Sequence, residues 1–452
     1  MEFNKNKLIF AIIWILMLLS VVLLLVTMNS ADKNNNKSSN SWDTFKIWVY
    51  WEAFKNSFEF VEWFKQVYPE YKNKEIIIEN FTSYEDYTYT LMSAINSWVA
   101  PDIFVLNNNE KNSVFANQTL WIDPKIVNPN DFRKKYKSFF SDDLIWIFNQ
   151  DWVDKEYIKW LPVWYETLGI FYNRRYVKDS DLKNLSTLNN IISDLKSKYP
   201  ELIPIWIWNW TTVFNSADII TQFFMLEWWV TSLWNINSNV LKQWLAAYLL
   251  YWDTTWYNWY NSRFQELKDT RRDSLYLFSR WEVIMVVWYP SMISKIKENW
   301  FSKTMLQASY FPHYFSWAWK ALVNYNTFVI NKDSLNLDMA NSFVSYLYSD
   351  SWAATYLSYH PYFLPALMSL ESDKMEQKID ADYTVTLWDF YNDSAEFSSF
   401  DKWVKNVYDK EIAILLDTNV ITEDLFNRFK ESVLCKTNKI ITFTNLWVNC
   451  DK

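Results

Sequence analysis

The chain has 452 residues and a formal net charge of −8 at pH 7. A chain of this length is typical of two or three domains, and its acidic balance argues against nucleic acid as a partner, because that role needs clustered basic side chains. Its two histidines, His313 and His360, offer little for a histidine-rich metal site or a histidine-based catalytic triad. We expect neither a metal nor another cofactor.

The glycine and tryptophan contents are both unusual. The chain has 1 Gly and 30 Trp, whereas soluble proteins average about 7% Gly. Many tryptophans stand where glycine is usual: Trp228 follows a helix-like run, and Trp206, Trp208 and Trp210 alternate after Pro204 in an expected loop. Since only glycine adopts positive φ cheaply, we interpret most of them as UGA-encoded glycines read here as Trp. A tryptophan-dense protein that stacks on sugars is the alternative.

An apolar segment opens the chain. Lys5 and Lys7 precede an uncharged apolar run over residues 8–26, which is long enough to cross a bilayer. The basic flank keeps the N-terminus inside the cell, so the remainder is exported. Neither a lipid-anchoring cysteine nor a clean cleavage site follows. We expect an uncleaved membrane anchor over 1–28 and a flexible linker over 29–42, with a cleaved signal peptide as the alternative.

Strands and helices alternate after the linker. The pattern predicts strands over 45–50, 75–79 and 100–106 and helices over 54–68 and 84–96. This alternation is typical of an α/β fold with a largely parallel sheet. In such a sheet, ligands bind beyond the carboxyl ends of the strands.

Polar and aromatic side chains stand at the predicted strand ends and would border one cleft. A tyrosine ring offers a flat apolar face and a polar edge, which suits a sugar ring. The same tyrosines can equally be core aromatics. The strand-end residues are Tyr50, Glu52, Asn107, Asn109, Tyr165, Glu166 and Tyr289.

The rest of the chain continues the alternation and ends in a pair of cysteines. Cys435 and Cys450 stand 15 residues apart. In an oxidising compartment a disulfide between them would close a loop and stabilise the fold by about 3 kcal/mol. Two free thiols are the alternative, and the spacing alone does not choose. Strands are predicted over 168–172, 202–207, 283–289 and 319–330, and helices over 181–199, 216–227, 240–251 and 337–357.

Four segments form an ordered set of short motifs: residues 94–104 with Pro101-Asp102, 161–173 with Tyr172-Asn173, 280–290, and 328–366 with Leu364-Pro365-Ala366. In this order they resemble the extracellular solute-binding proteins of ABC importers, in the family typified by maltose and oligosaccharide binders. The family has glycine where this chain has Trp98, Trp281 and Trp288. That agreement supports the UGA interpretation independently of composition.

The resemblance implies two α/β lobes, joined by crossing segments, that close over a ligand. Lobe 1 is expected to hold residues 43–163 and 318–357, and lobe 2 residues 164–317 and 358–452. The implied ligand is a sugar or oligosaccharide, and the implied partners are the permease subunits of an ABC transporter. No nucleic acid partner is expected.

The resemblance also implies roles for single residues. Glu166 matches an acidic residue that hydrogen-bonds sugar hydroxyls, Asn109 matches a polar ligand contact, and Tyr289 lies beside a stacking aromatic. At Leu106 the sequence departs from the family, which often has an aromatic there. The expected ligand-binding residues are Tyr50, Glu52, Asn107, Asn109, Tyr165, Glu166, Asp218, Tyr289 and Trp319.

We therefore expect a receptor on the extracellular or periplasmic face of the membrane, anchored by residues 8–26, that does no chemistry. One rival is an exported glycoside hydrolase that draws an acid/base pair from Glu52, Asp102 and Glu166. Asp102 follows Pro101, however, and is expected to cap a turn. The other rival is a ligand-free sensor or adhesin module that binds a protein.

Overall fold

The computed structural model describes residues 44–50, 57–110, 113–150, 153–207, 215–225, 274–299, 301–313, 319–391, 395–398 and 423–442, with residue 450 and single positions between 407 and 414. The predicted anchor and linker, Glu52 and the helix predicted over 240–251 lie outside these residues. Within them, no helix combines the length and apolar character needed to cross a membrane.

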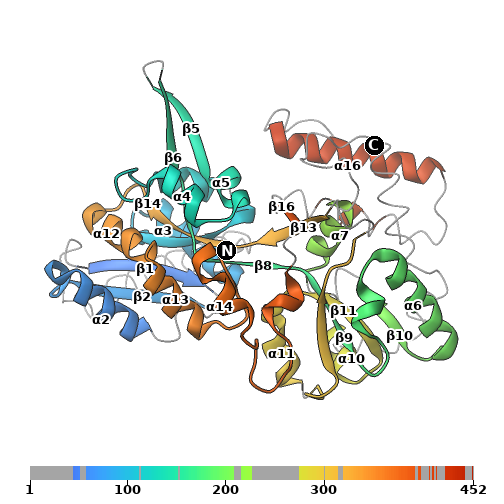
Figure 1. Ribbon diagram of the computed structural model, residues 1–452. Helices are drawn as coiled ribbons and strands as arrows, with labels where there is room; N and C mark the ends of the chain where they lie inside the picture. The colour runs from blue at the N-terminus through green and yellow to red at the C-terminus, as the bar shows by residue number, and fades with distance from the viewer. Residues whose placement is uncertain are drawn as a thin grey trace, which may run out of the picture.

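A mixed sheet forms the centre of the first of two α/β lobes (Figure 1). Its strand order is β2-β1-β3-β14-β4, and β7 also pairs with β14. The lobe contains β1 (Thr44–Tyr50), α2 (Ser57–Val67), η1 (Pro69–Tyr71), β2 (Glu75–Phe81), α3 (Tyr84–Asn96), β3 (Ile103–Asn107), η2 (Asn108–Glu110), η3 (Val114–Gln118), β4 (Thr119–Leu120), α4 (Pro129–Lys135), α5 (Ser138–Leu144), β5 (Ile145–Gln150), β6 (Val153–Ile158), β7 (Leu161–Pro162), β14 (Asn326–Asn331), α12 (Leu337–Leu347) and α13 (Asp350–Tyr359).

Local sequence explains why these elements form. α3 begins where the Ser83 side chain accepts a hydrogen bond from the Asp86 amide, which satisfies one of the free donors of a helix start. Along the helix, Tyr87, Leu91 and Ala94 are buried at the spacing that places side chains on one helix face. The predicted bounds 84–96 are those of the structure.

A second mixed sheet, with the order β10-β11-β9-β12, forms the centre of the second lobe (Figure 1). Its two central strands, β9 and β11, are buried on both faces, since every residue of each strand is buried. The lobe contains β9 (Gly169–Asn173), η4 (Asp179–Leu182), α6 (Leu185–Lys198), β10 (Ile203–Trp206), α7 (Ser216–Met225), α10 (Ser274–Ser279), β11 (Val283–Trp288), η6 (Pro290–Met292), α11 (Ile293–Glu298) and β12 (Leu306–Tyr310).

A short central sheet carries the chain between the lobes (Figure 1). β8 (Trp164–Thr167) follows β7 of the first sheet and precedes β9 of the second. β13 (Trp319–Asn324) runs antiparallel to β8 and leads directly into β14. The remaining strands of this sheet are β15 (Leu364–Pro365) and β16 (Ala395–Ser398). The structure is therefore two α/β lobes joined by crossing strands, as the resemblance implied.

The expectation of a largely parallel sheet is wrong. β1 is parallel to β2 and β3, but β14 is antiparallel to β3, and β9 is antiparallel to both of its neighbours. β14 and β9 enter their sheets from the crossing strands, without the helical crossover that parallel neighbours require.

The strand predicted over 202–207 is confirmed as β10, which ends at Trp206, although Trp206 was also expected in the loop that follows Pro204. One further prediction is corrected. The single helix predicted over 337–357 is two helices, α12 and α13, because the Ser349 side chain accepts from the Trp352 amide and starts a new helix.

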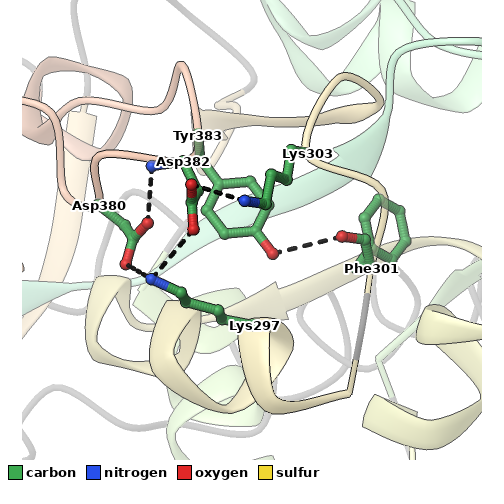
Figure 2. Close-up of polar contacts among 6 residues, drawn as sticks. All are labelled: Lys297, Phe301, Lys303, Asp380, Asp382 and Tyr383. Atoms are coloured by element: carbon green, nitrogen blue, oxygen red, sulfur yellow. Dashed lines mark hydrogen bonds and ion pairs between the residues drawn. The ribbon is translucent and has the colours of Figure 1, made fainter.

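A third connection, residues 364–391, is held by polar contacts at both lobes. Near its start, the Lys374 ammonium donates to a carbonyl oxygen of α13. On the second lobe, Lys297 pairs with both Asp380 and Asp382, and Lys303 lies 2.6 Å from Asp382 (Figure 2). The connection contains η7 (Met368–Leu370), α14 (Glu371–Met375) and η8 (Leu387–Phe390).

The C-terminal part contains one long helix, α16 (Glu423–Thr442). The sulfur atoms of Cys435, within this helix, and Cys450 are bonded, with 5.8 Å between the two Cα atoms. This distance lies in the usual range for a disulfide.

Gly169 begins β9, directly after the crossing strand. A Cβ atom there would lie against the Phe390 ring and 2.9 Å from the Ser309 backbone oxygen. We expect Gly169→Ala to lower the free energy of unfolding by about 1–3 kcal/mol, because the site has no room for a methyl group.

Urea denaturation of the two proteins measures this difference. In the Gly169→Ala background, Phe390→Leu should recover only part of the loss, because the Ser309 oxygen belongs to the backbone. An unchanged midpoint in the single variant would show that the strand moves freely enough to accept the methyl group.

Candidate functional site

Polar side chains of the first lobe meet where β1 and β3 end and β14 begins. The Tyr50 hydroxyl donates to Asn326 Oδ1 (2.7 Å). Asn107 Nδ2 donates to Asn326 Oδ1 (2.9 Å) and to Asn324 Oδ1 (2.7 Å). The parallel strands β1 and β3 end at one edge, and the antiparallel β14 starts at that edge. We call Tyr50, Asn107, Asn324 and Asn326 the amide cluster.

Asn109 lies beside the amide cluster. Its backbone N–H donates to Asn107 Oδ1 (3.0 Å), and its side chain is half-buried. Asn108 points elsewhere, since its Nδ2 donates to the Val323 carbonyl oxygen (2.9 Å). Of the three consecutive asparagines, Asn107 therefore belongs to the amide cluster and Asn109 lies beside it, while Asn108 fixes the connection between β13 and β14.

A carboxylate that the sequence analysis missed adjoins this cluster. Glu110 is buried, and its Oε1 accepts a hydrogen bond from the Tyr84 hydroxyl. The Tyr84 ring packs against Tyr50, with 5.0 Å between ring centroids. Burial raises the pKa of Tyr50 above its usual value, so its hydroxyl stays protonated and can donate.

Glu166 occupies the crossing strand β8 and is fully buried. Its Oε1 accepts a hydrogen bond from the Ser291 amide (3.0 Å), whereas Oε2 has no hydrogen-bond partner among the described residues. In the strand register Glu166 lies opposite Asn324. Glu166 is therefore a neighbour of the amide cluster. Burial raises the pKa of Glu166 to about 7, the Ser291 hydrogen bonds oppose this, and the charge of Asp218 adds to it.

The second lobe contributes Tyr289 and Asp218. Tyr289 follows β11 directly, and its hydroxyl donates to Asp218 Oδ2 of α7 (3.1 Å). Burial raises the pKa of Tyr289, and the negative charges of Asp218 and Glu166 raise it further. Tyr289 and Ser291 stand on one short turn, so this turn holds both Asp218 and Glu166.

The remaining predicted residues do not join these groups in the described structure. The Tyr165 side chain is fully buried against Phe139 (5.4 Å between ring centroids) and Phe140 (5.9 Å). Neighbouring strand residues point to opposite faces, so Tyr165 packs in an aromatic core while Glu166 faces the site. Trp319 begins β13, but its side chain lies outside the described part, as does all of Glu52.

Asp102 has a structural position at the far end of β3. Its carboxylate accepts from the Lys46 amide (2.8 Å) and the Ser334 hydroxyl (2.6 Å), so it ties β1 to a distant loop instead of capping a local turn. Five residues separate it from Asn107, which at about 3.3 Å per residue places it about 17 Å from the site. Asp102 and Glu166 are too far apart for an acid/base pair.

Among the described residues, no group of three or more His, Cys, Asp and Glu side chains could hold a metal ion. The polar atoms of the site are those of amides, carboxylates and tyrosine hydroxyls. Such a set makes directional hydrogen bonds to a polar ligand.

Sequence reasoning missed Asn324, Asn326 and Ser291. Asn107 and Asn326 are 219 residues apart, and only the pairing of β14 with β3 brings them together. A signal was present in Asn324-Tyr325-Asn326, where two amides flank the turn between two predicted strands. Nothing in the sequence indicates that Ser291 donates to Glu166 through its backbone.

Solved structures share this architecture, although no curated protein sequence matches the chain. The sugar-binding protein MalE of Xanthomonas citri has a TM-score of 0.63 at 14% identity, over 90% of this chain and all of that one. The GacH receptor of Streptomyces glaucescens has a TM-score of 0.60 at 13% identity, and the match covers 87% of this chain and 98% of the receptor. An ABC substrate-binding protein of Listeria monocytogenes, in complex with cycloalternan, has a TM-score of 0.59 at 12% identity. That match covers 87% of this chain and 99% of the other.

Identities this low establish the fold alone. Sequence membership comes from the model of the family described as bacterial extracellular solute-binding protein, which matches residues 60–383. That match spans most of the chain and contains every residue of the amide cluster except Tyr50, together with Glu166, Asp218 and Tyr289. The chain therefore belongs to the bacterial extracellular solute-binding proteins.

Proposed function

We propose that this protein captures a sugar or oligosaccharide between its lobes and presents it to the permease of an ABC importer. The observation that carries the proposal is the position of Glu166: it lies on the strand that joins the lobes, between the amide cluster and the pair Tyr289 and Asp218. Three structurally similar proteins support the ligand class: a sugar-binding protein, a receptor in complex with acarbose and a substrate-binding protein in complex with cycloalternan.

The ligand would lie between groups from both lobes. In this proposal the amide cluster and Asn109 bind hydroxyls from the first lobe, Glu166 binds from the crossing strand, and the second lobe adds Asp218 and Tyr289. Glu52 and Trp319 stay in the proposed set from the sequence analysis. Closing the lobes would replace the water around the ligand with these polar side chains and so supply specificity.

The same proposal assigns no chemistry to the protein. A glycoside hydrolase needs two carboxyl groups flanking one bond, about 5–10 Å apart. Asp102 lies at the opposite end of β3 and is occupied by the Lys46 amide and Ser334. Of the two partners that the sequence analysis considered for Glu166, Asp102 is therefore removed, which favours binding over catalysis; the other, Glu52, lies outside the described residues.

We further propose that residues 8–26 anchor the receptor in the membrane, with 29–42 as its linker, and that the lobe boundaries are 43–163 with 318–357 and 164–317 with 358–452. The apolar run, its basic flank and the extracellular family support this placement.

A thermal-shift screen of saccharides, polyols, amino acids and peptides tests the function. A saccharide is expected to raise the melting temperature in a concentration-dependent way. Product analysis after incubation separates the rivals: turnover of an oligosaccharide would establish the hydrolase, and the absence of any ligand across the panel would favour the sensor or adhesin.

We also propose that most tryptophans of this chain are glycines in the natural protein. In the described residues, Trp98 has φ 59° and Trp281 has φ 68°, a region that disfavours every residue with a Cβ. Both follow helices that end in the same way: Val99 N donates to the Ala94 oxygen and Glu282 N to the Leu277 oxygen. This is the Schellman motif, whose positive-φ position is usually glycine.

The double variant Trp98→Gly, Trp281→Gly is expected to be more stable than the chain as written, by about 1–2 kcal/mol at each position. Glycine removes the steric cost of positive φ at each helix end. Trp388→Gly is a matched control, because Trp388 lies in η8 without positive φ. Chemical denaturation measures the free energy of unfolding of the chain as written, the double variant and the control variant. Sequencing the gene reads the codons directly, and UGG at most tryptophan positions would refute the proposal.

A further inference from the structure

The side-chain amide of Gln222 joins a helix of the second lobe to a crossing strand. Gln222 lies in α7 and is buried. Its Nε2 donates to the Lys320 carbonyl oxygen (2.9 Å), and its Oε1 accepts from the Leu322 amide (2.7 Å). Both backbone groups belong to β13, which lies beside α7 (Figure 1). One side chain therefore satisfies a backbone acceptor and a backbone donor of the crossing strand.

The same helix carries Asp218, one turn before Gln222. Residues four apart lie on one face of a helix, so the face of α7 that meets β13 also presents Asp218. Asp218 Oδ2 accepts a hydrogen bond from the Tyr289 hydroxyl (3.1 Å). The helix is therefore held at two points, by Gln222 on the crossing strand and by Asp218 on the turn after β11.

These contacts complete a closed ring of interactions around the crossing strands. β13 pairs with β8, the strand that carries Glu166. Glu166 accepts from the Ser291 amide, and Ser291 stands on the same turn as Tyr289. Tyr289 holds Asp218, and the ring returns to β13 through α7 and Gln222. The position of Asp218 relative to Glu166 is thus set from two sides.

Apolar packing alone would not fix α7 along its own axis. Ile219, Ile220 and Phe223 of this helix are buried, but hydrophobic burial is non-directional. It selects the face that the helix buries and leaves the helix free to slide on that face. The hydrogen bonds of Gln222 depend on distance and angle, so they fix the axial position as well.

We propose that Gln222 is a positioning residue of the binding site: by fastening α7 to β13 it holds Asp218, and through it Tyr289, in a fixed place relative to Glu166. This inference rests on the proposed saccharide-binding function, in which these three side chains contact the ligand. They would then form one pre-arranged surface onto which the amide cluster of the first lobe closes. Pre-arrangement lowers the cost of ordering side chains on binding.

A double-mutant cycle in the ligand-free full chain, measured by urea denaturation, tests this assignment. Tyr289→Phe removes the hydroxyl that donates to Asp218, and Gln222→Met removes both hydrogen bonds to β13 while it keeps the length of the side chain. In the wild type, we expect Tyr289→Phe to raise the unfolding equilibrium constant about tenfold, as the loss of a buried hydrogen bond does. In the Gln222→Met background the increase should be less than about threefold, because a displaced Asp218 no longer accepts well from Tyr289.

Thr221→Val is the matched control. Thr221 is also buried in α7, but its hydroxyl donates to the Ala217 oxygen (2.7 Å), within the same helix. Tyr289→Phe should therefore keep its tenfold effect in the Thr221→Val background. Gln222→Glu is a second test variant: it keeps an acceptor for the Leu322 amide, should give an intermediate effect, and supplies the cycle if Gln222→Met does not fold.

An equal effect of Tyr289→Phe with and without the Gln222 amide would overturn the proposal, because a merely structural residue gives additive losses. A reduced effect in the Thr221→Val background would overturn it too, since any loosening of α7 would then act in the same way. No ligand enters the cycle, so its outcome is independent of the saccharide function, which the thermal-shift screen decides separately.

Discussion

Replacing Asp102 by alanine is expected to lower the free energy of unfolding by about 3–5 kcal/mol. The carboxylate accepts three hydrogen bonds: from the Lys46 amide (2.8 Å), the Ser334 hydroxyl (2.6 Å) and Asn336 Nδ2 (3.1 Å). Alanine would leave all three donors without this acceptor, two of them on buried or half-buried residues. A typical domain has a total stability of about 5–15 kcal/mol, so the loss would leave the first lobe marginal.

Urea denaturation followed by circular dichroism measures this effect. Asp102→Asn should be intermediate, because its amide nitrogen cannot accept from the Lys46 amide. Asp333→Ala, in the same loop as Ser334 but exposed, is the matched control and should change stability by less than about 0.5 kcal/mol. A small effect of Asp102→Ala would mean that water replaces the carboxylate, and its structural role would then be refuted.

Replacing Glu166 by glutamine is expected to stabilise the ligand-free protein above pH 7 by about 3 kcal/mol. Burial raises the pKa of Glu166 from 4.5 to about 7, so the folded protein holds this proton more tightly than the unfolded chain. The stability contributed by the neutral acid is complete below pH 4.5 and is lost as the pH rises towards and through about 7. Glutamine cannot ionise and loses nothing over that range.

The measurement is the difference in melting temperature between wild type and Glu166→Gln as a function of pH. The difference is needed because other groups also titrate: burial raises the pKa of Asp389 to about 6 and lowers that of His313 to about 2. Asp389 acts in the same direction as Glu166, whereas His313 costs stability as the pH falls below 6.5. A difference that does not grow between pH 4.5 and 7 would contradict a raised pKa at Glu166.

The ionised carboxylate of Glu166 is expected to destabilise the empty receptor above about pH 7. A functional site commonly carries such a local cost, so Glu166→Gln would gain stability while it loses the carboxylate proposed to contact the ligand.

Local sequence determined a large part of the secondary structure and the fold class. The bounds of α3 follow from Ser83 and from the four- and three-residue spacing of its buried side chains, which need no distant partner. The sequence analysis missed the end of α12 because Ser349 lies within an apolar helical pattern, where a serine is tolerated. Only the structure shows that the Ser349 side chain caps the next helix. Tyr50, Asn107 and Glu166 were chosen as candidates because strand ends in α/β folds are where ligands bind, and the structure places each of them at a strand end or in a crossing strand.

Tertiary structure alone decided how those residues combine. Tyr165 and Glu166 look alike as strand-end candidates, yet the alternation of strand faces sends one into an aromatic core and the other to the site. Asn326 joins Asn107 because β14 runs antiparallel to β3, and strand direction is set by how the chain crosses between lobes. Periodicity and capping act within a few residues and can be read from the sequence, whereas pairing partners are chosen by the free energy of the whole fold.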